Sequence, residues 1–178
     1  MSFEFTNNFE HSLSKFNLSE KSFGVAVSGG SDSVALVILL STWADKNKKK
    51  LFVVTVDHGL RSAAADEAIY VKKLCLKNNI QHKILKIESD VSGNVQAWAR
   101  ENRYRVISEW ANKNRIKSIF LGHTLEDQAE TVLLRLGRGS GVDGLAAMQS
   151  QSFRENIKWL RPLLNIQRND LREFLKFE

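Results

Sequence analysis

Ser28-Gly29-Gly30-Ser31-Asp32-Ser33 separates a short apolar segment, 23–27, from a longer one, 34–40. The first segment is typical of a buried strand and the second of a buried helix. A strand that turns through paired glycines into a helix directs backbone N–H groups and the positive end of the helix dipole at one point. The loop lacks the lysine of the usual phosphate loop. Its three serine hydroxyls and one carboxylate therefore predict a polyphosphate site in which Asp32 is a Mg²⁺ ligand. The alternative is a plain turn in which Ser31 or Asp32 caps the helix.

The composition describes an ordinary globular chain of one domain. The 178 residues are 43% apolar and 26% charged. The start of the chain lacks the basic and apolar regions of a signal peptide, and the longest apolar run, 34–40, is too short to span a bilayer. A single cysteine, Cys75, excludes an internal disulfide and a Cys-x-x-Cys site within this sequence, and we expect it to be buried. These features predict a cytoplasmic protein with no membrane segment.

Arginine is concentrated in the second half of the chain. The net charge is +6, and of eleven arginines only Arg61 precedes residue 100. Because arginine makes planar, bidentate contacts with phosphates and bases, this half of the chain indicates a nucleotide or nucleic-acid partner. Solvated helix faces are the alternative explanation.

The order of apolar segments predicts an α/β fold with a five-stranded parallel sheet and helices on both faces. Strands are expected at 23–27, 51–56, 82–87, 117–121 and 157–160, and helices at about 7–18, 31–44, 62–79, 94–112, 124–137 and 167–178. Residues 137–144 hold four glycines and are expected to be irregular. Ligands of such sheets bind beyond the carboxyl ends of the strands. Polar clusters follow three of the strands, at 28–33, 57–61 and 122–127, so we expect one site at that edge.

Several motifs resemble a known family. Ser28–Ser33 resembles the Ser-Gly-Gly-x-Asp-Ser signature of the N-type ATP pyrophosphatases, the PP-loop superfamily. Segments 56–61, 122–131, 138–145 and 161–164, in this order, are similar to the tRNA(Ile)-lysidine synthetases. The resemblance covers roughly residues 23–175. It implies that residues 1–178 are one PP-loop domain, either a catalytic fragment of a longer synthetase or a chain without the further tRNA-binding domains, with a homodimer as a candidate assembly.

The resemblance also implies a reaction and its cofactors. ATP would adenylate the C2 carbonyl oxygen of the wobble cytidine in the CAU anticodon of tRNA(Ile), with release of pyrophosphate. The amine of free L-lysine would then displace AMP. In this scheme Ser28, Gly29, Gly30, Ser31 and Ser33 bind the β- and γ-phosphates, and Mg²⁺ held by Asp32 neutralises the leaving group.

The resemblance suggests roles for further side chains, each with an alternative. Asp127 is expected to be the second metal ligand or to bind the substrate amine, although Thr124-x-x-Asp127 also fits a capping box. His123 would contact the α-phosphate or only end the strand. His58 would contact a phosphate or transfer a proton, or have no role.

The arginines near these motifs are candidates for phosphate binding. Arg61 is expected to bind a phosphate of ATP. Arg100 and Arg103 lie one helical turn apart, within an Ala-Arg-x-x-Arg-Tyr pattern, and are candidates for ATP phosphates or the tRNA backbone. Two other functions stay open: a related enzyme that thiolates tRNA, and an ATP-binding module without catalysis.

Overall fold

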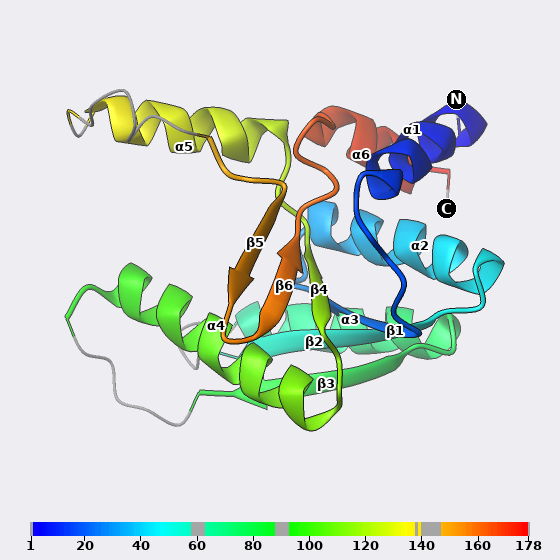
Figure 1. Ribbon diagram of the computed structural model, residues 1–178, viewed down its shortest axis with the longest axis horizontal. Helices are drawn as coiled ribbons and strands as arrows, with labels where there is room; N and C mark the ends of the chain where they lie inside the picture. Colours follow the sequence, from blue (N-terminus) through cyan, green and yellow to red (C-terminus); the bar gives the residue numbers. More distant parts are fainter. Residues whose placement is uncertain (1, 58–62, 88–92, 138, 140–146, 178) are drawn as a thin grey trace.

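The computed structural model describes residues 2–57, 63–87, 93–137, 139 and 147–177. Its elements are α1 (Ser2–Ser14), β1 (Ser22–Ala26), α2 (Ser31–Lys46), β2 (Lys50–Asp57), α3 (Ala63–Lys77), β3 (Gln81–Lys86), α4 (Val95–Lys113), β4 (Ser118–Leu121), α5 (Leu125–Gly137), β5 (Gln151–Arg154), β6 (Ile157–Leu160) and α6 (Arg168–Leu175) (Figure 1). None of the helices described is long and apolar enough to cross a membrane.

The sheet has the order β3-β2-β1-β4-β6-β5. All five strands expected from the sequence are present, and they pair in parallel. The expected strand count was nevertheless wrong, because β5 adds a sixth strand, antiparallel to β6. The segment 151–154 has one large apolar side chain, Phe153, which is 70% exposed, so an edge strand here has no burial pattern for the sequence to reveal. Glu155 and Asn156, with φ of 53° and 63°, form the tight turn between the two strands.

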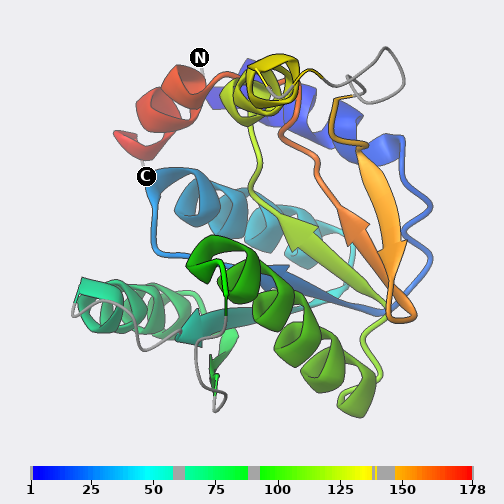
Figure 2. The ribbon, with the colours of Figure 1, turned by 90° about the vertical axis from the view of Figure 1, so that its left-hand side faces the viewer.

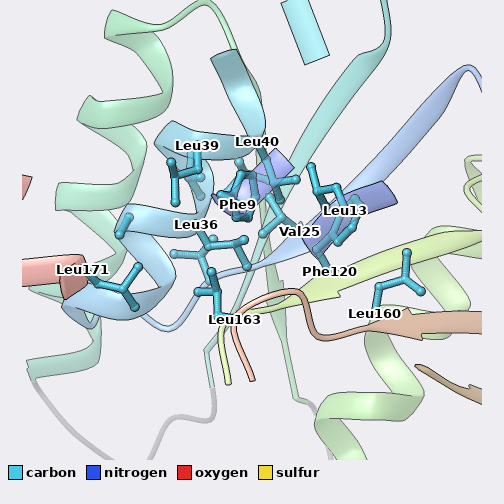
Figure 3. Close-up of a cluster of buried hydrophobic side chains, with 14 of the residues drawn as sticks. Phe9, Leu13, Val25, Leu36, Leu39, Leu40, Phe120, Leu160, Leu163 and Leu171 are labelled. Atoms are coloured by element: carbon cyan, nitrogen blue, oxygen red, sulfur yellow. The ribbon is translucent and has the colours of Figure 1, made fainter. Parts of the chain in front are cut away.

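Helices cover both faces of the sheet, as predicted. On one face, α1 and α2 pack their apolar side chains against β1 and β4, with Phe9, Leu36 and Leu40 around Val25 and Phe120 (Figure 3). Residues of α3 and α6 belong to the same core, and the thiol of Cys75 on α3 is buried there as expected.

The opposite face is covered by α4. Tyr104 and Ile107 of this helix lie in a second core with Ile119 of β4 and Trp159 of β6. The two rings, Tyr104 and Trp159, meet edge to face with their centroids 4.6 Å apart. Figure 2 shows α4 and α2 on opposite sides of the sheet.

Two helices depart from their expected limits. The apolar spacing of Phe9, Leu13 and Phe16 predicted a helix to residue 18, but α1 ends at Ser14 and Phe16 packs from the turn that follows. At the other end of the chain, α6 stops at Leu175. Both α5 and α6 lie beyond the ends of β4 and β6 (Figure 1), where the backbone N–H of Leu125 donates to the carbonyl of Ile166 at 3.1 Å.

Candidate active site

The loop 28–33 joins β1 to α2 at the edge of the sheet where ligands were expected. Gly29 takes a φ of 93°, a backbone conformation that favours glycine. The Ser33 hydroxyl closes the loop: it accepts from the backbone N–H of Ser28 at 3.3 Å and donates to the carbonyl of Gly30 at 2.9 Å.

The loop leaves the start of α2 without a side-chain cap. Gly30 is the N-cap residue, so the alternative in which Ser31 or Asp32 caps the helix is wrong: both lie inside its first turn. The first amides of α2 therefore have no capping side chain at the N-cap position. This is the arrangement in which a helix N-terminus binds a phosphate.

Gly122 brings a second turn against this loop. A Cβ atom at Gly122 would lie 3.2 Å from Cα and 3.3 Å from the backbone nitrogen of Ser33. Such a contact is tighter than most Cβ contacts, so a side chain here would require the turn between β4 and α5 and the start of α2 to move apart by a few tenths of an ångström. The contact places the first turn of α5 beside Asp32.

Asp127 divides its two oxygens between a structural and a site contact. Oδ2 accepts from the backbone N–H of Thr124 at 2.7 Å and from its hydroxyl at 3.1 Å. This contact forms the N3-to-N-cap half of the expected capping box. Oδ1 is turned the other way and accepts from Arg168 at 3.0 Å. The capping role therefore does not exclude a role in the site.

Arg168, at the start of α6, bridges the two carboxylates. Its Nε donates to Asp32 Oδ2 at 2.9 Å, and its Nη2 donates to Asp127 Oδ1 at 3.0 Å. All three side chains are partly buried, with exposed fractions of 30% for Arg168, 18% for Asp32 and 26% for Asp127. Desolvation opposes the charge of Arg168, but the Asp32 hydrogen bond and the nearby carboxylates outweigh it and raise the pKa of the guanidinium.

Arg168 is a site residue that was not expected from the sequence. Its helix follows β6 and was expected only from apolar spacing, which says nothing about the place of an arginine in the first turn. One signal was available, the excess of arginine in this half of the chain.

A third carboxylate fixes the backbone of Arg168. Glu126 accepts from the Arg168 backbone N–H through both oxygens, at 2.9 and 3.0 Å. Gln167 is the N-cap residue of α6 and its side chain makes no capping hydrogen bond. Glu126 thus caps α6 from the neighbouring helix, and the backbone at residue 168 is held independently of its side chain.

Glu126→Ala is expected to lower the free energy of unfolding by about 1 kcal/mol, the usual effect of losing a helix cap. Burial raises the pKa of Glu126, but the hydrogen bond from the Arg168 backbone and further contacts lower it overall. The contribution of Glu126 to the free energy of unfolding is therefore fully present above the unfolded-state pKa of its carboxyl group. It is lost as the pH falls through the lower folded-state pKa. Urea denaturation at pH 7 and pH 3 measures both effects. Glu130→Ala, at an exposed position of the same helix, is the control and should leave stability unchanged.

His123 and Arg161 place buried polar atoms beside this site. In the described part of the chain, His123 Nδ1 and Arg161 Nε are buried and have no hydrogen-bond partner. The pKa of His123 is lowered to about 4, chiefly by burial. The positive charges of Arg161, Arg100 and Arg103 lower it further, and Asp127 opposes them. His123 is therefore neutral at pH 7. Polar atoms buried beside cationic groups suit an anionic ligand.

The other predicted residues lie at different distances from this centre. Arg100 is exposed on α4, with its guanidinium carbon 5.5 Å from the centre of the Tyr104 ring, and Arg103 is close enough to affect the pKa of His123. His58 and Arg61 fall outside the described residues. The predicted roles of all these side chains stay predictions.

The donor set fits a magnesium ion bound together with phosphates. Within the described ranges, no group of three or more His, Cys, Asp or Glu side chains is placed to hold a metal alone. Mg²⁺ usually takes one or two carboxylates, and substrate phosphates and waters complete its shell. Asp32 and Asp127, close enough to share one guanidinium beside an uncapped helix start, match that pattern.

Known proteins resemble this chain in sequence. A family model described as a PP-loop domain matches residues 1–178. The chain is 47% identical to the tRNA(Ile)-lysidine synthase of Ruegeria pomeroyi over 156 residues, which are 87% of this chain and 37% of that protein. It is 45% identical to the enzyme of the same name from Wolbachia pipientis, covering 85% of this chain and 36% of that protein. The chain thus spans little more than a third of the length of these curated relatives.

Solved structures of low sequence identity share the fold. The U34-tRNA thiolase NcsA from Methanococcus maripaludis, which carries a [4Fe-4S] cluster, has a TM-score of 0.81 at 20% identity, covering 98% of this chain and 64% of that one. NMN synthetase from Francisella tularensis has a TM-score of 0.64 at 16% identity, covering 99% of this chain and 70% of that one. At these identities the likeness establishes the architecture alone.

Proposed function

The chain belongs to the PP-loop domain family, and from this membership we propose that it carries out ATP-dependent formation of lysidine at the wobble cytidine of a tRNA(Ile) with a CAU anticodon. The observation that carries the proposal is the pair Asp32 and Asp127, which two different turns bring to one guanidinium beside an uncapped helix start. The identity of 37–47% to three curated tRNA(Ile)-lysidine synthases supports the choice of reaction.

The reaction proceeds in two displacements. The C2 carbonyl oxygen of the cytidine attacks the α-phosphorus of ATP, and the bond to the β-phosphate oxygen breaks to release pyrophosphate. The amine of lysine then attacks C2 and loses a proton, and AMP leaves with the former carbonyl oxygen. Both steps build negative charge on a phosphate leaving group, which the site must stabilise.

The residues of the loop and its neighbouring turn divide this work. The first amides of α2 and the hydroxyls of Ser28, Ser31 and Ser33 hold the β- and γ-phosphates. Asp32 and Asp127 would hold Mg²⁺, and a bound Mg²⁺ would supply positive charge to the departing pyrophosphate. Neutral His123 donates a hydrogen bond from its ring N–H to an oxygen of the α-phosphate, beside Arg161, Arg100 and Arg103.

The cysteine content favours lysidine formation over tRNA thiolation. Enzymes that thiolate a base with a persulfide or a cluster need reactive cysteines. This sequence has one, Cys75, which lies buried on α3, and burial raises the pKa of its thiol to about 11. A buried thiol that stays protonated is a poor nucleophile.

The proposal extends to the setting of the enzyme. Residues 1–178 act as one PP-loop domain in the cytoplasm, where tRNA and free lysine meet. The proposal includes a homodimer, which analytical ultracentrifugation would detect directly.

Lysine incorporation tests the proposal. The chain is incubated with ATP, Mg²⁺, radiolabelled lysine and a tRNA(Ile) transcript with a CAU anticodon, and a transcript with a UAU anticodon is the control. Pyrophosphate release that requires the CAU transcript, with label in the RNA only when lysine is present, is expected. Tight ATP binding without pyrophosphate release would instead identify an ATP-binding module. Release followed by transfer from a sulfur donor, and none from lysine, would identify a thiolation enzyme.

A further inference from the structure

Arg168 occupies the oxygens that the proposed metal would need. Asp32 uses Oδ1 locally, where it accepts from the Ser31 hydroxyl at 3.0 Å, and Asp127 uses Oδ2 to cap α5. The second oxygen of each carboxylate, Asp32 Oδ2 and Asp127 Oδ1, accepts from Arg168. While the guanidinium lies between these two oxygens, its N–H donors and its positive charge compete with a metal ion for them.

The backbone anchor allows the side chain to move without disturbing the helix. The N–H of Arg168 is held by Glu126, and α6 is fixed to the core by Leu171 and Phe174, which are 0% and 7% exposed. The Arg168 side chain is 30% exposed, so solvent reaches it. It can therefore exchange its partners through rotation of its own bonds.

A released guanidinium would have new partners nearby. Asp32 lies in the first turn of α2, directly after the loop proposed to hold the β- and γ-phosphates. Arginine binds phosphate oxygens through a planar, bidentate fork, as it binds carboxylates. When the guanidinium leaves the two aspartates, its positive charge therefore stays within the same site.

We propose that Arg168 is a displaceable internal cation: it holds Asp32 and Asp127 together before the substrate arrives, yields both oxygens to a divalent metal ion, and then pairs with the phosphates of the leaving group. The inference rests on the metal role of the two aspartates in the proposed function. It explains how two carboxylates can be kept close together and ready for a metal in its absence, since their mutual repulsion is cancelled by a group of the chain itself.

Binding of Mn²⁺ in the absence of nucleotide, followed by electron paramagnetic resonance, tests the first half of the proposal. Arg168→Gln removes the competing charge, so Mn²⁺ is expected to bind about tenfold more tightly than to the parent chain, given two charge-assisted hydrogen bonds at a partly exposed site. Arg168→Lys keeps the charge but loses the fork, and an intermediate affinity is expected. Arg172→Gln, an exposed position on the same helix, should leave the affinity unchanged.

The second half of the proposal predicts an opposite effect on turnover. With Mg²⁺ and ATP, Arg168→Gln is expected to slow RNA-dependent pyrophosphate release although it binds the free metal more tightly. A merely structural role would weaken both properties together. Equal or weaker Mn²⁺ binding by a folded Arg168→Gln variant, or no Mn²⁺ binding by either protein, would overturn the proposal. Since the Mn²⁺ measurement uses neither RNA nor lysine, it can fail while lysine incorporation succeeds, and the two proposals are tested separately.

Discussion

Asp32→Asn is expected to reduce RNA-dependent pyrophosphate release by about a thousandfold and to leave the fold intact. The substitution keeps the shape of the side chain but removes the negative charge that the metal role requires. Arg168 loses its charged partner at 2.9 Å and keeps Asp127 at 3.0 Å. Because this ion pair is partly exposed, the loss of stability should stay within about 1 kcal/mol.

Two measurements on this variant separate its chemical effect from its structural one. Pyrophosphate release is measured over a range of Mg²⁺ concentrations, and the free energy of unfolding is measured with urea. Asp45→Asn is the matched control, since Asp45 is an exposed residue near the other end of the same helix. Turnover close to that of the parent chain, with an unchanged Mg²⁺ dependence, would remove Asp32 from the metal site.

The parallel part of the fold could be predicted because its strands are buried on both faces. Segments such as 51–56 are continuous apolar runs between polar turns, and such runs are typical of a parallel sheet. The edge strand β5 was missed for the opposite reason. Its side chains meet solvent, so its place depends on pairing with β6, which the local sequence does not encode.

The site could be predicted only as far as strand order determines it. Asp32 and Asp127 were expected at one edge because both follow parallel strands, and the structure brings them together. Arg168 reaches them through the path of the chain from β6 to α6, and no local pattern specifies that path. The buried, unpartnered atoms of His123 and Arg161 likewise follow from packing rather than from spacing.

Gly122→Ala is expected to lower kcat/KM about a hundredfold, because the added methyl group would push the loop 28–33 away from the turn that carries Asp127. The new Cβ would lie 3.2 Å from Cα and 3.3 Å from the nitrogen of Ser33. These neighbours are backbone atoms of Ser33, a buried residue, and they cannot rotate away as a side chain would. We expect a loss of about 2 kcal/mol in stability from the overpacking. The loss of activity should exceed any loss of folded protein at the assay temperature.

Gly137→Ala provides the control for this prediction. Gly137 ends α5, and a Cβ there would meet nothing within 4 Å, so neither activity nor stability should fall. Pyrophosphate release and urea denaturation are compared for both variants. A Gly122→Ala protein with the parent activity would show that the two turns can separate without harm, and that the catalytic geometry does not depend on their contact. If activity falls as expected, the loop 28–33 and the turn that carries Asp127 work as one rigid unit. The lack of a side chain at Gly122 then sets the distance between them.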